Sequence, residues 1–366
     1  VNKVDAQFSD RFKKLLSWAD EIREMKVFAN ADNEIDAKVA FDFGAEGIGL
    51  CRTEHMFFGA ERLIEMRRFI LASDHEARIG ALEKIKTYQV EDFEAIFRLS
   101  QDRPTIVRLL DPPLHEFLPS SDEDIASVAE QLDIPKDVLR KRIAELNEVN
   151  PMLGHRGCRL AITYPELYEM QVEAIIESVL QLKKEGIECH PEIMIPLVST
   201  VEEFITLKDR LAETITQLKN DAKTNVNYLI GTMIETPRAC LIAQQLAQHC
   251  DFFSFGTNDL TQLTYGFSRD DAGKFINVYT ESNILQIDPF QTLDKDGVGQ
   301  LIQYAVEQAK QIKPEIKIGV CGELGGDAKS IHQFNQWSID YVSCSPFRVP
   351  GAILATAQSQ AEESER

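Results

Sequence analysis

Charged, amide and thiol side chains recur in this sequence at the points where apolar runs end. The stretch "FFSFGTND" (252–259) is the sharpest case, because a run typical of a buried strand stops at Gly256 and turns polar at Thr257, Asn258 and Asp259. Other runs end in Arg52 and Glu54, Arg108 and Asp111, His155 and Arg156, Glu235, and Cys321 and Glu323. Carboxylates suit hard divalent cations, guanidinium groups suit phosphate and carboxylate, and a thiol can move a proton or attack as a nucleophile.

Glu235 and Asp259 are the acidic residues that follow two successive apolar runs. Asp259 alone could simply cap a following helix. Helix capping does not explain Glu235, because Thr236-Pro237 follow it where the strand has ended. Two carboxylates from neighbouring strand ends form an oxygen site suited to Mg²⁺ or Mn²⁺, which take few protein ligands and use substrate oxygens for the rest. We therefore predict that Glu235 and Asp259 bind a metal.

Several arginines are predicted around the same site. Arg108 interrupts the apolar run "TIVRLL", and a buried guanidinium group needs an anionic partner from the protein or a ligand. Arg52 and Glu54 lie two residues apart on a strand and could instead form a structural ion pair. Arg156, Arg269 and Arg348 add three more guanidinium groups in later segments. Such a set favours a multiply charged anion as the ligand.

Cys321 lies between glycines in "GVCGELGG" at the end of a run. A buried cysteine is commonly a plain core residue, and this reading suits Cys158, Cys240 and Cys250. Glycines, however, let backbone and substrate approach closely, and a thiol can serve as general acid or as nucleophile. The chain has 7 cysteines at scattered positions without a CxxC pair. This pattern fits a reducing compartment and argues against a disulfide framework or a zinc site.

Composition excludes some classes of partner. The chain of 366 residues has a net charge of -20 and is 44% hydrophobic, which is typical of a globular protein with a large core. The negative charge disfavours nonspecific binding to nucleic acid or to an anionic membrane surface. No run reaches the roughly 20 apolar residues of a membrane span, and the first residues do not resemble a signal peptide.

Alternating apolar runs and amphipathic segments predict an α/β fold. Continuous apolar runs indicate strands buried on both faces, hence a parallel sheet. Eight such units favour a (β/α)8 TIM barrel; the rival open doubly wound sheet usually carries a glycine-rich phosphate loop, and no GxGxxG or GxxxxGK[ST] occurs here. The predicted strands lie in 26–32, 46–54, 104–111, 150–157, 191–198, 227–235, 251–259 and 316–323.

The remaining segments are assigned around this barrel. Residues 1–24 are predicted as a lead-in helix, 25–358 as the barrel and 359–366 as a tail. Residues 112–149 form a polar, helical insertion after the third strand, and 265–297 form a second excursion. Long insertions on the side where catalytic loops lie commonly shape an active site.

Six motifs together are specific enough to indicate a family. They are "GAEGIGLCRTEHMFF", "MLGHRGCRLAITYPE", "GTMIETPRA", "FGTNDLTQ", "DPFQTLDKDGVGQL" and "GVCGELGGD". The chain closely resembles the C-terminal phosphoenolpyruvate/pyruvate-binding domain of the pyruvate phosphate dikinase family, from about residue 25 to about residue 355. "CRTEHMFF" and "DPFQTLD" resemble the dikinase more than its relatives phosphoenolpyruvate synthase and enzyme I of the sugar phosphotransferase system.

The resemblance implies an activity and roles for the predicted residues. In the family, an ATP-grasp domain phosphorylates a histidine on a swivelling domain, and the barrel exchanges that phosphoryl group with pyruvate through an enolate that Mg²⁺ stabilises. Cys321 would move the proton at the methyl carbon, and Arg52 and Arg108 would act in catalysis. The residues implied to contact substrate are Arg52, Arg108, Arg156, Gly256, Thr257, Asn258, Asp259, Arg269 and Glu323, with Glu235 and Asp259 binding Mg²⁺.

The resemblance also implies partners and a compartment. The family typically forms homodimers through this barrel, and its members occur in cytoplasm, which we expect here, or in plastids and glycosomes. No ATP-grasp segment and no T-S-H histidine motif occurs in this chain. We therefore expect only a partial reaction from it, either as part of a longer enzyme or as a separately encoded barrel.

One departure from the family pattern leaves two other functions open. Leu324 stands where the family usually has histidine in "CGEHGG", and leucine can neither donate a hydrogen bond nor transfer a proton. The alternatives are a stand-alone Mg²⁺-dependent lyase or decarboxylase acting on α-keto acids, and a degenerate barrel kept for dimerisation or regulation.

Overall fold

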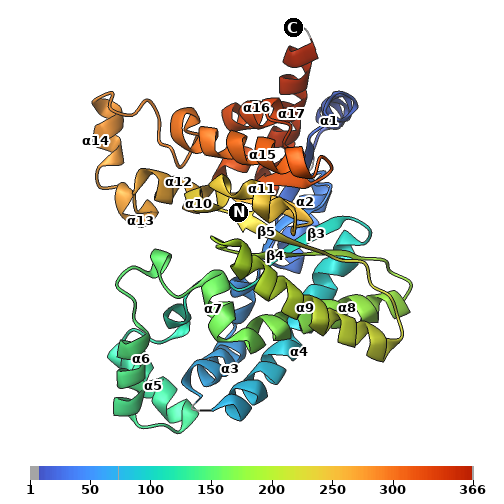
Figure 1. The fold of residues 1–366 in the computed structure, drawn as a ribbon. Helices are drawn as coiled ribbons and strands as arrows, with labels where there is room; N and C mark the ends of the chain where they lie inside the picture. Colours follow the sequence, from blue (N-terminus) through green and yellow to red (C-terminus); the bar gives the residue numbers. More distant parts are fainter. Residues whose placement is uncertain (1–7, 73, 365–366) are drawn as a thin grey trace.

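Eight parallel strands close into a barrel in the computed structural model, which describes residues 8–72 and 74–364 (Figure 1). Each strand pairs with the next along the chain, and β8 closes the barrel against β1. The strands are β1 (Lys26–Asn30), β2 (Ile48–Arg52), β3 (Pro104–Arg108), β4 (His190–Ile195), β5 (Leu229–Ile234), β6 (Phe252–Gly256), β7 (Lys317–Cys321) and β8 (Tyr341–Cys344). The predicted (β/α)8 barrel is confirmed.

One predicted strand is wrong and another was missed. Residues 150–157 form a short turn, Pro151–Leu153, followed by the start of helix α7 (Gly157–Thr163). Pro151 has no backbone N–H to donate, and Gly157 has φ +56°, so this segment does not continue a ladder. The missing strand is β8, whose four residues, Tyr341–Cys344, are too few to show a periodic pattern. Every predicted strand after 150–157 therefore lies one place earlier in the barrel.

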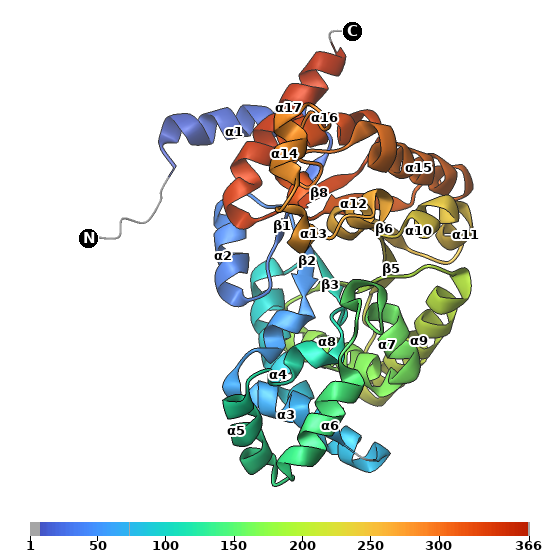
Figure 2. The same ribbon diagram turned by 90° about the vertical axis from the view of Figure 1, so that its left-hand side faces the viewer.

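Helices surround the barrel on its outside (Figure 2). Between successive strands lie α2 (Glu34–Asp42), α3 (Ala60–Leu71), α4 (His75–Ser100), α7, α8 (Pro165–Lys184), α9 (Val201–Ala222), α10 (Pro237–Leu241), α11 (Ala243–Ala247), α12 (Thr257–Tyr265), α15 (Gln300–Ile312) and α16 (Ala328–Gln336). Helix α17 (Val349–Ser364) follows β8 and packs against α1 (Asp10–Ile22). Residues 1–7 of the predicted lead-in helix and residues 365–366 of the predicted tail lie outside the described residues, and residues 359–364 continue α17.

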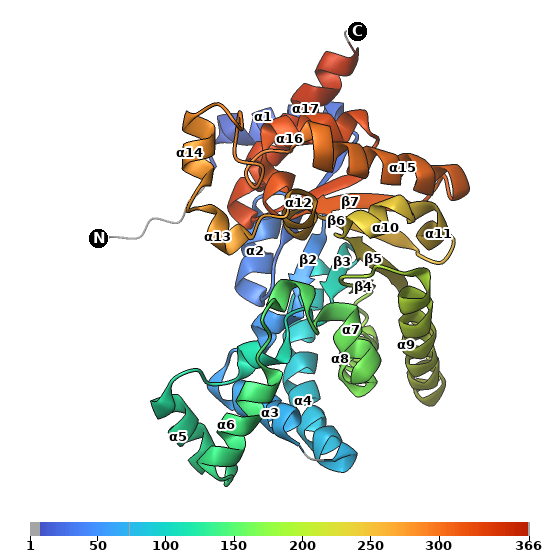
Figure 3. The ribbon, with the colours of Figure 1, turned by 60° about the vertical axis from the view of Figure 1, so that its left-hand side comes forward.

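Two excursions project from the barrel. The insertion after β3 contains α5 (Asp122–Leu132) and α6 (Lys136–Leu146), held by their own small apolar cluster of Ile125, Val128, Ala129 and Leu139. The excursion after α12 contains α13 (Arg269–Ala272) and α14 (Ile276–Glu281), with a second small cluster around Phe290. Both excursions extend to the same side of the molecule in two views (Figures 1 and 3). In the part of the chain that the structure describes, no helix is long and apolar enough to cross a bilayer.

All 7 cysteines are buried and free, and burial raises the pKa of each thiol. Burial raises the pKa of Cys240 from 9.0 to about 12. Unfolded thiols ionise above pH 9 while folded ones keep their proton. The stabilising contribution of each thiol is therefore complete below pH 9 and is lost as the pH rises toward the folded pKa.

Removing one of these thiols should flatten the alkaline pH dependence of stability. Between pH 10 and 11 we expect Cys240→Ala to reduce the fall in unfolding free energy by about 1.4 kcal/mol per pH unit, the value for one titrating group. Urea unfolding at a series of pH values under reducing conditions measures this slope. Ser178→Ala, which removes a buried hydroxyl group that does not titrate, should shift stability without changing the slope. Equal slopes in Cys240→Ala and the parent would contradict the burial-induced shift.

Candidate active site

The closed barrel brings the strand-end residues to one rim. In a parallel barrel all carboxyl ends face the same way, so the side chains that follow them converge. Arg52 at the end of β2 is in register with Arg108 at the end of β3. Gly256 at the end of β6 is in register with Cys321 at the end of β7. The polar residues that sequence reasoning selected thus come from adjacent strands of one face.

Asp259 does not cap the helix on which it lies. Helix α12 starts at Thr257, its N-cap is Gly256, and no side chain caps it. The Asp259 carboxylate instead accepts a hydrogen bond from Arg156, with Nη1 3.2 Å from Oδ1. The side chain is 15% exposed. A helix cap is therefore not the reason for an aspartate at this position.

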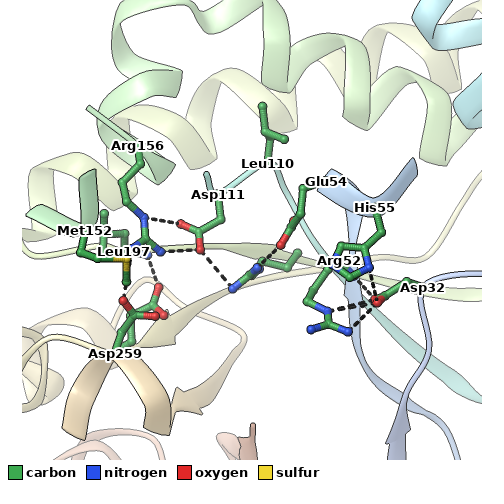
Figure 4. Close-up of polar contacts among 12 residues, drawn as sticks. Asp32, Arg52, Glu54, His55, Leu110, Asp111, Met152, Arg156, Leu197 and Asp259 are labelled. Carbon is green, nitrogen blue, oxygen red and sulfur yellow. Dashed lines mark hydrogen bonds and ion pairs between the residues drawn. The ribbon is translucent and has the colours of Figure 1, made fainter. Parts of the chain in front are cut away.

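Two arginines share one aspartate at the centre of the site (Figure 4). Asp111 Oδ2 lies 2.6 Å from Arg156 Nη2 and 3.1 Å from Arg108 Nη1. Arg108 also forms an ion pair with Glu54. Arg156 Nε lies 3.2 Å from Asp111 Oδ1, which makes the Arg156–Asp111 contact bidentate. Both guanidinium groups are therefore fixed in direction by the protein before any ligand arrives.

The charges of this network hold one another in the ionised state. Burial opposes the charge of Arg108 and Arg156, but the surrounding carboxylates outweigh it and raise the pKa of both guanidinium groups. Burial likewise tends to raise the pKa of Asp111, but Arg108 and Arg156 lower it below its ordinary value. Arg52 pairs instead with Asp32.

Glu235 is completely buried beside this network. Its Oε1 accepts a hydrogen bond of 2.6 Å from the backbone N–H of Leu197, while Oε2 has no hydrogen-bond partner. Burial, then the charges of Asp259 and Asp111, raise the pKa of Glu235. Leu197 holds the unusual φ of +62°, which turns its N–H toward the carboxylate. A buried carboxylate with a bare oxygen and a like charge nearby is a place where a cation would be stabilised.

Gly256 gives Glu235 the space that it occupies. A Cβ built at Gly256 would lie 2.7 Å from Glu235 Oε2 and 2.7 Å from Met233 Sδ. No group of three or more His, Cys, Asp or Glu side chains fit to hold a metal occurs among residues 8–72 and 74–364. The carboxylates of Glu235 and Asp259 therefore offer at most a two-ligand site, which is the kind that Mg²⁺ completes with water and substrate oxygens.

Cys321 lies in the barrel interior at the end of β7, and the residue is 1% exposed. Burial raises the pKa of its thiol to about 11, with the Ser254 hydroxyl group and Arg108 acting in the opposite direction. The hydroxyl group of Thr257 donates to the carbonyl oxygen of Cys321 at 3.1 Å, so it anchors the thiol-bearing backbone. Gly322 has φ +95°, a conformation that favours glycine directly after the thiol. The structure thus presents a thiol that keeps its proton at neutral pH.

A cavity of about 380 Å³ opens above these groups. Six of the predicted site residues line it: Arg52, Arg108, Asn258, Asp259, Arg269 and Glu323. The other five, Arg156, Glu235, Gly256, Thr257 and Cys321, are buried and do not line it. Leu324, the departure in the glycine-rich motif, is 1% exposed and packs in the main hydrophobic core.

Asp32 is the clearest residue that sequence reasoning did not select. Its Oδ1 accepts from the Arg52 backbone N–H at 2.7 Å, and its Oδ2 accepts from Arg52 Nη2 at 2.6 Å (Figure 4). It also lies 3.2 Å from His55 Nδ1. Although burial lowers the pKa of Arg52, Asp32 raises it above its ordinary value. The signal was available, since Asp32 ends the first predicted strand as the other polar residues end theirs.

Comparison with known proteins gives a consistent match. Residues 6–361 match the family model described as "PEP-utilising enzyme, PEP-binding domain". The chain is 49% identical over 360 residues to "Pyruvate, phosphate dikinase" of Clostridium symbiosum, covering 98% of this chain and 41% of that protein. It is 52% identical over 360 residues to the protein of the same name from Rhizobium meliloti, covering 98% and 40%.

A chloroplastic protein is among these relatives. "Pyruvate, phosphate dikinase 1, chloroplastic" of Arabidopsis thaliana is 51% identical over 352 residues, covering 96% of this chain and 37% of that protein. The chain thus spans about two-fifths of the length of the curated relatives that it matches.

Proposed function

The chain belongs to the family of PEP-utilising enzymes, and on this premise we propose that it is the pyruvate half-site of a pyruvate phosphate dikinase. In this proposal the barrel exchanges a phosphoryl group between a phosphohistidine on another domain and the enol oxygen of pyruvate, forming phosphoenolpyruvate reversibly. The observation that carries the proposal is the single barrel rim at which a cavity lined by Arg52, Arg108 and Asp259 meets the paired arginines, a buried carboxyl group and a protonated thiol.

Glu235 and Asp259 fit the role of Mg²⁺ ligands. The bare Oε2 of Glu235 and the charge of Asp259, which raises the pKa of Glu235, support this assignment. When bound, Mg²⁺ would supply stabilisation of the negative charge that develops on the enolate oxygen. The side-chain amide of Asn258, which directly precedes Asp259 on α12, would donate a hydrogen bond to a substrate oxygen.

Arg52, Arg108 and Arg156 would bind the carboxylate and phosphoryl oxygens, joined by Arg269 from α13. Each of the first three is fixed by an acidic partner, Asp32, Glu54 or Asp111, so little rotational freedom is lost when the ligand binds. Phosphoryl transfer depends mainly on this kind of positioning and charge stabilisation.

Cys321 would move the proton at the methyl carbon. From phosphoenolpyruvate, the phosphorus–oxygen bond breaks as the histidine nitrogen takes the phosphoryl group, and the thiol then donates its proton to the methylene carbon of the enolate. In the reverse direction the thiolate recovers a proton from the methyl group of pyruvate. The raised pKa of the thiol suits the donor role, because the group stays protonated at neutral pH.

The partners follow from the same proposal. The rest of the enzyme would supply the phosphohistidine and ATP-grasp domains. The proposal also includes a homodimer formed through the barrel and a cytoplasmic compartment. The length of the relatives supports additional domains, because this chain covers 41% of the Clostridium symbiosum protein.

Calorimetry of the purified chain tests this function. We expect phosphoenolpyruvate and oxalate, which has the two-oxygen geometry of enolpyruvate, to bind only when Mg²⁺ is present. Titrations in Mg²⁺ and in excess chelator form the matched pair. Equal binding in both, or binding in neither, would contradict the proposal.

Asp32 gives a test of how the cavity orients its arginines. We expect Asp32→Asn to weaken Mg²⁺-dependent phosphoenolpyruvate binding about tenfold, because a hydrogen bond to a charged group contributes about 1.5–3 kcal/mol and part of it persists in the amide. Calorimetry measures the dissociation constant. Asp42→Asn, an exposed carboxylate with 63% side-chain exposure on α2, is the control and should bind as the parent does. Unchanged affinity in Asp32→Asn would show that Arg52 needs no such support.

A further inference from the structure

Arg348 is a cationic residue at the rim for which the proposed function has no role. It ends the turn Pro346–Arg348 that follows β8, the strand missed from sequence. Its Nη1 lies 3.2 Å from the carbonyl oxygen of Glu323 and 3.5 Å from Glu323 Oε2. The other carboxylate oxygen of Glu323, Oε1, lies 3.9 Å from Arg269 Nη2. Glu323 therefore lies between two guanidinium groups and is closer to Arg348.

The backbone is shaped for the contact of Arg348 with Glu323. A Cβ built at Gly326 would lie 2.7 Å from Arg348 Nε and 3.0 Å from its Cζ. A Cβ at this position would force the end of the Arg348 side chain to shift. The glycine thus lets Arg348 lie against the turn Glu323–Gly326, which directly follows Cys321 and Gly322.

Arg269 and Glu323 form the boundary between two cavities. Both line the substrate cavity of about 380 Å³ and an outer cavity of about 640 Å³. Arg348 lines the outer cavity. The side chains of Arg269, Glu323 and Arg348 are 46%, 55% and 42% exposed, so their ion pairs are weaker than the buried pairs at the centre. A ligand entering the substrate cavity can therefore compete with Glu323 for Arg269.

The substrate cavity has more carboxylates than guanidinium groups around it, so a guanidinium group that a carboxylate occupies is lost to an anionic ligand. Five carboxylates line the substrate cavity, against three guanidinium groups. They are Glu54, Asp111, Asp259, Asp270 and Glu323, against Arg52, Arg108 and Arg269. A phosphorylated ligand adds more negative charge. Glu323 is the carboxylate most able to occupy Arg269, because it is the one paired with it.

We propose that Arg348 is a positioning residue that holds Glu323 and so leaves Arg269 free to bind the phosphoryl group of the ligand. The inference rests on the proposed function, because it takes phosphoenolpyruvate as that ligand. Without Arg348, Glu323 would turn toward Arg269 and compete with the phosphoryl group. A ligand without a phosphoryl group would not lose an interaction.

Calorimetry in Mg²⁺ with phosphoenolpyruvate and oxalate tests this role in the full 366-residue chain. We expect Arg348→Gln to weaken phosphoenolpyruvate binding about fivefold, the size of an exposed ion pair, and to leave oxalate binding unchanged. The double variant Glu323→Gln/Arg348→Gln should regain most of the lost affinity, because the competing carboxylate is gone. Arg348→Lys, which keeps the charge, should fall between the parent and Arg348→Gln. Thermal melts identify any variant that fails to fold, in which case Arg348→Lys carries the comparison.

Three results would overturn the role of Arg348. The first is an unchanged phosphoenolpyruvate affinity in Arg348→Gln. The second is an equal loss of affinity for phosphoenolpyruvate and oxalate, and the third is a loss of phosphoenolpyruvate affinity that Glu323→Gln does not restore. The second and third results would indicate a purely structural residue. A parent chain that binds neither ligand in Mg²⁺ would instead overturn the proposed function itself.

Discussion

Replacing Glu235 by glutamine or Asp259 by asparagine is expected to abolish Mg²⁺-dependent binding of oxalate and phosphoenolpyruvate. Each change removes one of the two carboxylates proposed to bind the cation. Loss of an outer-shell partner of a metal commonly costs 10–100-fold in affinity, so loss of a direct ligand should cost on the order of 100-fold or more. Calorimetry at a fixed Mg²⁺ concentration measures it, and Asp42→Asn serves as the matched control.

Glu235→Gln should keep its stability, which separates a loss of binding from a loss of folding. The glutamine oxygen can still accept the hydrogen bond that Leu197 donates to Glu235. Burial and the charges of Asp259 and Asp111 raise the pKa of Glu235 to about 8, so glutamine replaces a carboxyl group that is already largely neutral at pH 7. We therefore expect the melting temperature of Glu235→Gln without metal to equal or exceed that of the parent. Full Mg²⁺-dependent binding in a stable Glu235→Gln variant would rule out this residue as a ligand.

Cys321→Ala is expected to stop proton transfer while leaving ligand binding in place. With Mg²⁺ present, the parent chain should catalyse exchange of the pyruvate methyl protons with deuterium from solvent, because it forms the enolate without any phosphoryl donor. Removing the acid–base group should slow this exchange by about 10²–10⁴-fold. Proton NMR of pyruvate in D₂O follows the exchange directly.

Two controls isolate the thiol at the rim. Cys344→Ala removes another buried thiol, at the end of β8, and should leave the exchange rate near that of the parent. Calorimetry with oxalate should show that Cys321→Ala still binds the ligand, since the thiol is proposed to move a proton and not to hold the anion. Parent-like exchange in Cys321→Ala would assign the proton transfer to a different residue.

The choice of residues at the rim was readable from the sequence because of the symmetry of a parallel barrel. Every strand of such a barrel ends on the same face, so the residue types that follow the apolar runs predict the contents of one site. Arg52, Arg108, Asp259 and Cys321 were selected in this way, and the structure brings them together. The closed barrel was predicted from the count of eight alternating units, although the eight runs counted included one that is not a strand.

Arg156 reaches the rim from a different element than the one predicted for it. It was predicted at the end of a strand over 150–157, but it lies just before α7, and its guanidinium group reaches Asp111 from a loop. The local sequence has glycines and a proline that permit several backbone paths. In the structure, the hydrogen bond of 2.8 Å from the Gly157 N–H to the Asp111 carbonyl oxygen and the ion pair of Arg156 with Asp111 hold the observed path.

Partners and distances were decided by the tertiary structure. The pairing of Asp32 with Arg52, the turned N–H of Leu197 and the contact of Arg348 with Glu323 each join segments that no sequence period relates. The sequence by itself determined a parallel barrel and the chemical types at its rim, because burial on both faces and strand polarity are local patterns. The tertiary structure decides which charges meet, that Glu235 Oε2 has no partner and that the Cys321 thiol keeps its proton. All three depend on burial and on distances between remote segments, which exist only once the barrel has closed.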